Sequence, residues 1–263
     1  MKVEVLVATM NFDGGTELLE KMNIGSDVIV CNQGDTDAKA EFEYKSKSVT
    51  VLSSSDRGVG KNRNKGLFHS TADVVVFADN DVRYVDDYAK TVSEYYEQNP
   101  KAEVVIFNFK VKRGDSDFND VNKKDKKATG RDVTRFGTYA ISAKREALLK
   151  KRISFSLLFG GGAKYQCGED SLFLRDCYKS GLKIYLCSKT LGKVEHNEST
   201  WFTGVNEKYC YDKGALFGAM FGKTAWVYLL YHAFKHRKTY ATIGKFSKVY
   251  ALMKKGAREF LGK

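Results

Sequence analysis

Two aspartates stand at the end of a strongly apolar segment, and their spacing could bind a metal ion. The segment VVVFADNDV places Asp79 and Asp81 two residues apart, directly after a predicted buried strand. In an extended chain such residues point to the same side, and two adjacent carboxylates repel unless a cation lies between them. Mg²⁺ and Mn²⁺ prefer such oxygen ligands and leave positions for substrate phosphates. A polar turn that caps the next helix is an equally good interpretation of this motif alone.

A second acidic pair opens a predicted helix. Glu169 and Asp170 follow the glycine-rich segment FGGGAKYQCG and precede the helical pattern SLFLRDCYKSG. An ionised carboxylate at this place could act as a general base that accepts a proton from an incoming hydroxyl. Acids in a first helical turn also interact favourably with the helix dipole, so the pair alone could serve only to cap the helix.

Two further segments could supply ligands. His196 follows a predicted strand in the segment VEHNES. Its imidazole could complete a metal site formed by the two aspartates, although a lone histidine is more often structural. In residues 56–66, DRGVGKNRNKG, the side chains of Lys61 and Arg63 lie near a predicted helix start, where they could face a diphosphate. This segment matches neither a P-loop nor the dinucleotide-binding glycine pattern.

Alternating apolar runs and helical segments in the first 110 residues predict the sheet that positions these side chains. Runs that are apolar on both faces are typical of parallel strands covered by helices. Ligands of such sheets bind beyond the carboxyl ends of the strands, where Asp79 and Asp81 would lie. The predicted strands cover residues 3–8, 27–31, 48–54, 72–78 and 102–109, and the predicted helices between them cover residues 17–22, 60–70 and 84–99.

The rest of the chain is more polar and its charge is uneven. Residues 110–131 predict a loop or lid, and the pattern of residues 142–151 predicts a helix. From residue 201 to 263 there are 12 Lys and Arg against 3 Asp and Glu, whereas residues 1–200 have 32 against 29. The net charge of +12 therefore belongs mainly to the C-terminal quarter, which we expect to be helical.

Length and composition exclude several classes of protein. A chain of 263 residues can form one large domain or two small ones, and 43% hydrophobic with 29% charged residues excludes disordered and fibrous classes. No apolar run reaches the roughly 20 residues of a transmembrane helix, and the N-terminus predicts a strand rather than a signal peptide. The five cysteines form no CxxC pair, which argues against a disulfide framework or zinc knuckle and favours a reducing, cytoplasmic compartment.

In their order along residues 1–205, the motifs resemble those of the family-2 glycosyltransferases of GT-A fold. The six segments that carry the resemblance are VLVATMN, DVIVCNQGDTD, RGVGKNRNKGL, FADND, GED with its helix, and EHNEST. The resemblance implies an α/β fold with a Rossmann-like, mostly parallel sheet flanked by helices. It implies a catalytic domain over residues 1–205, with a nucleotide-sugar-binding half (1–110) and an acceptor-binding half (111–205). Residues 206–263 would then form a basic amphipathic helical extension.

The resemblance also assigns residues to the sugar-nucleotide donor. Thr9 and Asn11 would lie beside the nucleotide, and Arg63 would approach the nucleotide or its diphosphate. Asn32 stands where the family has an aspartate that accepts the uracil N3 proton. An asparagine carbonyl oxygen can accept the same hydrogen bond without a charge.

Metal and catalytic roles follow in the same way. The resemblance implies that Asp81 binds Mn²⁺ or Mg²⁺, that Asp79 contacts the ribose or the metal, and that His196 completes the metal or diphosphate site. Asp170 would be the catalytic base, and Glu169 would position the acceptor.

The implied activity is an inverting, metal-dependent transfer of a hexose or N-acetylhexosamine from a UDP-sugar to a saccharide acceptor. The family suggests a lipid-linked acceptor in surface polysaccharide biosynthesis, such as that of a capsule, exopolysaccharide or O-antigen. Two rivals are a sugar-nucleotide nucleotidyltransferase and a basic nucleic-acid-binding protein. The first lacks a basic residue soon after the first strand, and the second leaves both acidic pairs unexplained, so we expect no nucleic-acid partner.

The C-terminal pattern gives a prediction about location. Apolar and aromatic residues recur at helical spacing in WVYLLYHAFKHRK and KFSKVYALMKKGAREFL, with Lys and Arg between them. This pattern is typical of helices that lie in an anionic membrane interface. We therefore expect a cytoplasmic protein bound peripherally to the inner face of the plasma membrane. The alternative is a helical pair that packs only on the catalytic domain.

Overall fold

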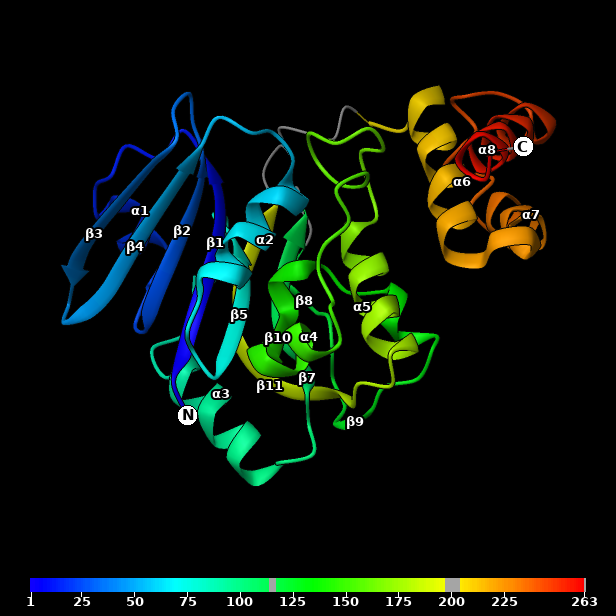
Figure 1. The fold of residues 1–263 in the computed structure, drawn as a ribbon. Coiled ribbons are helices and arrows are strands. Elements are labelled where there is room, and N and C mark those ends of the chain that lie inside the picture. The colour runs from blue at the N-terminus through cyan, green and yellow to red at the C-terminus, as the bar shows by residue number, and fades with distance from the viewer. Residues whose placement is uncertain (114–116, 197–203, 263) are drawn as a thin grey trace.

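A computed structural model describes residues 1–113, 117–196 and 204–262, and the side chains of Arg113 and His196 lie outside the described part. Its strands form one mixed sheet (Figure 1). The strands are β1 (Val3–Met10), β2 (Asp27–Gln33), β3 (Ala38–Tyr44), β4 (Lys47–Ser54), β5 (Val74–Asp79), β6 (Val82–Tyr84), β7 (Val104–Arg113), β8 (Asn119–Asp120), β9 (Lys126–Lys127), β10 (Ile141–Lys144) and β11 (Ile184–His196). The α-helices are α1 (Glu17–Met22), α2 (Val59–His69), α3 (Tyr88–Gln98), α4 (Arg145–Lys150), α5 (Glu169–Lys179), α6 (Glu207–Phe221), α7 (Ala225–Lys235) and α8 (Phe246–Phe260).

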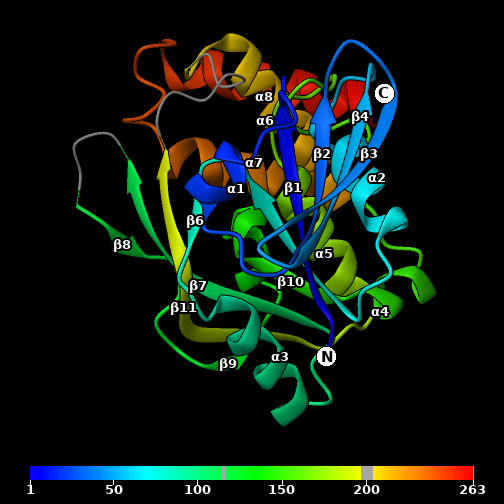
Figure 2. The same ribbon diagram turned by 90° about the vertical axis from the view of Figure 1, so that its left-hand side faces the viewer.

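The sheet is mostly parallel, as the sequence predicts. Its strand order is β3-β4-β2-β1-β5-β10-β7-β11-β6, and β4, β2, β1 and β5 pair in parallel. Residues on both faces of β1 and β5 are buried because helices cover both sides, which explains their unbroken apolar runs. Figure 2 shows α1 and α3 on one side of β1, and α2, α4 and α5 on the other. The predicted α/β fold, with a mostly parallel sheet flanked by helices, is therefore confirmed.

Two expectations about the middle of the chain are wrong. The segment predicted as a helix over residues 142–151 begins as β10, which pairs antiparallel with both β5 and β7, and α4 starts only at Arg145. The predicted loop over residues 110–131 contains the end of β7 and the short strands β8 and β9, which pair with β7 and β11. Tertiary pairing outweighs local propensity in both segments.

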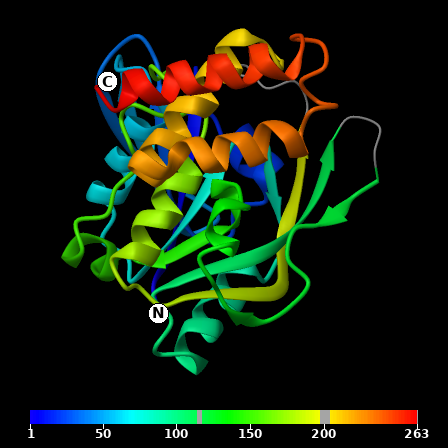
Figure 3. The ribbon, with the colours of Figure 1, turned by 90° about the vertical axis from the view of Figure 1, so that its right-hand side faces the viewer.

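The C-terminal region is helical, as expected, and α6 connects it to the sheet-containing part of the chain. Leu216 of α6 packs with Leu172 of α5 in one buried apolar cluster. Helices α6 and α8 cross so closely that a Cβ on Gly214 would lie 1.9 Å from the carbonyl oxygen of Met253. Figure 3 shows α7 and α8 side by side on the outer surface of this region. Among the described residues, every helix is too short or too polar to cross a membrane.

Candidate active site

The carboxyl ends of β1, β2 and β5 bring the first candidate residues together. The register places Thr9 opposite Asn32 and Ala8 opposite Asp79, so polar side chains from three strands meet at one edge of the sheet. Asp79 is the last residue of β5, whereas Asp81 lies in the turn that leads to β6. Asp79 therefore belongs to an extended chain and Asp81 does not, so strand geometry does not place the two carboxylates on the same side as expected.

Arg63 joins the two acidic motifs. Its guanidinium donates from Nη2 to Asp79 Oδ1 at 2.6 Å and from Nη1 to Glu169 Oε1 at 2.9 Å. The Arg63 side chain is only 4% exposed, and the carboxylates of Asp79 and Glu169 are 34% and 15% exposed. Burial lowers the pKa of Arg63, but the charges of Asp79 and Glu169 outweigh it and raise that pKa above its usual value. Residues far apart in the sequence thus form one compact ionic cluster.

Asp170 lies next to this cluster at the start of α5. Gly168, the residue before the helix, has a φ of +95°, and a Cβ there would lie 2.4 Å from Leu216 of α6. This close contact and the left-handed backbone both favour glycine and fix where α5 begins. Burial, and then the charge of Glu169, raises the pKa of Asp170 to about 6. A carboxylate with this pKa is ionised at neutral pH and is basic enough to accept a proton.

The residues expected around the nucleotide base already have partners within the protein. The Phe12 N–H donates to Asn32 Oδ1 at 2.9 Å, and Asn32 Nδ2 donates to Ser53 Oγ at 3.1 Å. Asn80 donates to the Thr9 hydroxyl at 3.1 Å. Asn32 Oδ1 has a second lone pair, so it can still accept from a ligand. Asn11 is exposed and has a φ of 53°, a left-handed conformation that asparagine tolerates better than most residues.

Two side chains that contribute to this site were not predicted from the sequence. Asn62 of α2 is buried, and its Nδ2 donates to the carbonyl oxygen of Cys31 at 2.7 Å, which ties the helix to the end of β2. Asparagine is a poor helix former, so its presence within α2 was an available signal. Lys213 of α6 adds a positive charge that opposes the effect of burial on the pKa of Asp170. No sequence signal linked this lysine, in the basic C-terminal region, to Glu169 and Asp170.

The donor atoms at the end of β5 fit a metal ion that substrate phosphates complete. Asp79 and Asp81 offer carboxylate oxygens, the ligands of Mg²⁺ and Mn²⁺, and Asp79 is partly exposed. No group of three His, Cys, Asp or Glu side chains that could hold a metal occurs within the described residues. The expected third ligand, the His196 side chain, lies outside them, although β11 runs to this residue. The phosphates of a nucleotide would have to supply the missing ligands.

Comparisons with known proteins agree with this architecture. The profile described as Glycosyl transferase family 2 matches residues 17–167, more than half of the chain. Residues 1–349 of S. aureus TarS, solved in complex with UDP-GlcNAc, superpose with a TM-score of 0.63 at 15% identity, over 92% of this chain and 74% of that one. The mannosyltransferase PcManGT from Pyrobaculum calidifontis, in complex with GDP-Man and Mn²⁺, gives a TM-score of 0.53 at 13% identity, over 99% and 87% of the two chains.

No curated protein matches this sequence significantly. The two structural likenesses show the fold, and the profile match shows the family. The matched residues contain Asn32, Arg63, Asp79 and Asp81, and they end just before Glu169 and Asp170. The chain therefore belongs to glycosyl transferase family 2 and is a glycosyltransferase.

Proposed function

We propose that this enzyme transfers a hexose or N-acetylhexosamine from a UDP-sugar to a saccharide acceptor, with inversion at the anomeric carbon. The observation that carries the proposal is the Arg63 cluster, in which one guanidinium holds Asp79 at 2.6 Å and Glu169 at 2.9 Å. Asp79 belongs to the sheet edge where nucleotides bind in α/β folds, and Glu169 adjoins the proposed base Asp170. The cluster therefore fixes the donor side and the acceptor side relative to each other. TarS, which binds UDP-GlcNAc, supports a uridine donor.

The proposed reaction is a single displacement. Asp170 accepts the proton of the acceptor hydroxyl. At the same time, the hydroxyl oxygen of the acceptor attacks the anomeric carbon from the face opposite the nucleoside diphosphate. The new glycosidic bond forms as the bond to the diphosphate oxygen breaks, so the configuration inverts. Glu169, held by Arg63, would orient the acceptor. Arg63 places its positive charge at the same sheet edge as the departing diphosphate.

A divalent ion, Mn²⁺ or Mg²⁺, is part of the proposal. Asp81 and Asp79 would hold it together with the donor phosphates, and His196 is the proposed additional ligand. When bound, the ion would act as a Lewis acid that stabilises the charge on the leaving diphosphate. PcManGT, solved with GDP-Man and Mn²⁺, supports this part of the proposal.

Calorimetric titration with nucleotides tests the donor and the metal together. We expect UDP to bind in the presence of Mn²⁺ more tightly than GDP, CTP or an oligonucleotide, and to bind far more weakly when the metal is chelated. Asp81→Asn should weaken the metal-dependent binding of UDP by more than about tenfold. Replacing a residue that only hydrogen-bonds to a metal ligand already weakens metal binding by at least about tenfold, and Asp81 is proposed as a ligand itself.

Asp87→Asn is the matched control for this titration. Asp87 is an exposed aspartate just before α3, and its side chain makes no capping hydrogen bond. This variant should bind UDP like the parent protein. Metal-independent binding of UDP, or equal losses in both variants, would contradict the metal site.

We further propose that the acceptor is lipid-linked, in surface polysaccharide biosynthesis, and that the enzyme acts at the inner face of the plasma membrane. Helix α7 supports this location because its large side chains face outward. Trp226, Tyr231 and Phe234 are 57%, 63% and 60% exposed, whereas the small Ala225 and Ala233 are buried. Aromatic residues beside Lys and Arg are typical of helices that lie in a membrane interface.

Co-sedimentation with vesicles tests this location. The chain should sediment with anionic vesicles at low salt and less at high salt, because salt screens surface charges. A triple variant with serine at residues 226, 231 and 234 should stay in solution. Leu157→Ser with Leu158→Ser is the control, since these exposed leucines, 57% and 50% exposed, lie elsewhere in the sequence. Failure of the parent protein to sediment at low salt would disprove the location.

A further inference from the structure

A groove between α7 and α8 combines an apolar lining with basic side chains. Its volume is about 300 Å³. Apolar side chains that line it are Trp226 and Leu229 from α7 and Tyr250 from α8. Three cations, Lys223, Lys254 and Arg258, also line it. The groove is separate from the Arg63 cluster, and the proposed sugar transfer uses none of its residues.

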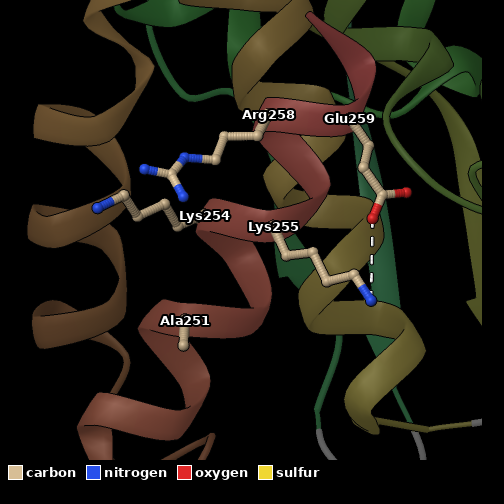
Figure 4. A pocket seen from close by; sticks show the side chains of 5 residues that line it. All are labelled: Ala251, Lys254, Lys255, Arg258 and Glu259. Carbon is tan, nitrogen blue, oxygen red and sulfur yellow. Dashed lines mark ion pairs between the residues drawn. The ribbon is translucent and has the colours of Figure 1, made fainter. Parts of the chain in front are cut away.

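The positive charges in the groove have no ion-pair partner among residues 1–113, 117–196 and 204–262. Figure 4 shows that Lys254 and Arg258 extend to the same side of α8, whereas Lys255 turns to the other side and pairs with Glu259 at 3.8 Å. Within the described part of the chain, neither Lys254 nor Arg258 has a carboxylate within ion-pair distance. The groove lining contains no Asp or Glu among the described residues, so its net charge is positive. Glu259 lines the adjoining pocket with Lys254 and Arg258, and it pairs with Lys255. Such a site attracts an anion.

The apolar lining restricts which anion fits. A free inorganic phosphate could pair with the cations but would leave the apolar side chains without a partner. A phosphate that is esterified to a hydrocarbon chain would satisfy both parts, with its charge on Lys254 and Arg258 and its chain along the apolar wall. Trp226 belongs both to the groove and to the exposed aromatic face of α7, so the groove opens on the surface that we place against the membrane.

We propose that the α7–α8 groove binds the phosphate headgroup of an anionic phospholipid, with Lys223, Lys254 and Arg258 around the phosphate. The proposal rests on the membrane location proposed above and adds one defined lipid site to it. A generally basic surface attracts many lipids weakly, whereas this groove would bind one lipid at a fixed place. Bound there, the lipid would hold α7 and α8, and through α6 the catalytic part, at the bilayer surface.

Tryptophan fluorescence can report binding directly. The chain has two tryptophans, so Trp201→Phe leaves Trp226 in the groove as the only one. In this background, dihexanoyl phosphatidylglycerol, kept below its micelle concentration, should saturate a shift of the Trp226 emission to shorter wavelength. Dihexanoyl phosphatidylcholine and inorganic phosphate should give no saturable shift at the same concentrations. No sugar nucleotide is present, so the result does not depend on the proposed transferase activity, and vesicle sedimentation tests the location separately.

Two double variants separate a defined site from general electrostatics. Lys254→Ala with Arg258→Ala should weaken binding about thirtyfold, because each cation near an anionic lipid contributes about a factor of five. Lys238→Ala with Lys245→Ala removes the same charge from exposed positions outside the groove lining, and it should change the affinity less than twofold. Equal losses in the two variants, a saturable shift with inorganic phosphate, or no shift with phosphatidylglycerol would each overturn the proposal.

Discussion

Replacing Asp170 with asparagine should lower kcat by about a thousandfold, within the 10²- to 10⁴-fold range that general bases contribute, while UDP binding stays unchanged. Asparagine has the size of aspartate but cannot accept a proton at neutral pH. The parent enzyme should also lose activity as the pH falls below about 6, because Asp170, whose pKa burial and then Glu169 raise to about 6, becomes protonated. Initial rates of transfer between pH 5 and 8, with calorimetry for UDP, measure both effects.

The same substitution should stabilise the folded protein at high pH. The pKa of Asp170 is about 6 in the folded chain and near 3.8 when exposed, so the folded state favours the protonated form. The free energy of unfolding therefore decreases as the pH rises from about 4 to 6. Above pH 6, the buried charge of Asp170 destabilises the folded state. Asp170→Asn should raise the melting temperature at pH 8 by about 6 °C. A pKa raised from 3.8 to about 6 corresponds to roughly 3 kcal/mol, and each 1 kcal/mol shifts the midpoint of a chain of this size by at least about 2 °C. At pH 3 the two proteins should melt alike.

Asp176→Asn is the matched control for Asp170→Asn. Asp176 lies on the same helix α5, and burial raises its pKa as well, but it has no place in the Arg63 cluster. This variant should keep the parent rate. If Asp170→Asn kept a near-normal kcat, Asp170 would not be the base, and Glu169 would become the next candidate.

The parallel core of the fold could be predicted from the sequence because its signal is local. The strands β1, β2, β4 and β5 are short apolar runs, and the predicted helix over residues 60–70 became α2 at Val59–His69. β10 escaped detection because the segment SAKREALLKK consists of good helix formers, and only its position between β5 and β7 makes its first residues a strand. The strand conformation of these residues therefore depends on pairing with residues that are distant in the sequence.

In the candidate site, too, the local sequence indicates single residues but not their tertiary contacts. Asp79, Glu169 and Arg63 could each be selected from the sequence, but the ionic cluster that joins them could not. Arg63 lies 16 residues from Asp79 and 106 from Glu169 in the sequence, and nothing in the local pattern specifies either contact. Every functional role stays a prediction, both toward donor and metal and in catalysis. The residues concerned are Thr9, Asn11, Asn32, Arg63, Asp79, Asp81, His196, Glu169 and Asp170. The amino-acid type indicates the chemistry of a side chain, whereas the fold determines which residues it contacts.

Helix α7 shows why the sequence could not tell which face of the C-terminal region is buried. The segment AWVYLLYHAFK is apolar on nearly all sides, so its periodicity selects no face. In the structure, Ala225, Leu229 and Ala233 face the bundle, and the large aromatic residues remain outside. The C-terminal helices therefore pack on the rest of the chain through α6, whereas the membrane location expected from the exposed aromatic face of α7 stays a prediction.

Replacing Arg63 with methionine should destabilise the protein by about 3–5 kcal/mol, the loss expected when one partner of a buried ionic group is removed. The melting temperature should fall by roughly 10 °C. Methionine can still pack against Phe155, whose ring centre lies 5.4 Å from the guanidinium, but it loses the cation–π interaction together with both ion pairs, so the loss reports the charge. Arg83→Met is the control, because the Arg83 side chain is exposed and, among the described residues, donates to the carbonyl oxygen of Lys21 and to no carboxylate. Thermal unfolding of the two variants measures the difference.

A triple variant distinguishes the structural role of Arg63 from its role in catalysis. Arg63→Met combined with Asp79→Asn and Glu169→Gln leaves no charge of the cluster without a counter-charge, so most of the lost melting temperature should return. Sugar transfer should stay at least a hundredfold below the parent rate, because the side chains proposed to hold the donor metal and orient the acceptor have lost their charge. Recovery of both stability and activity would mean that the cluster is a structural element outside the active site. Recovery of neither would mean that Arg63 stabilises the fold through contacts other than its two carboxylates.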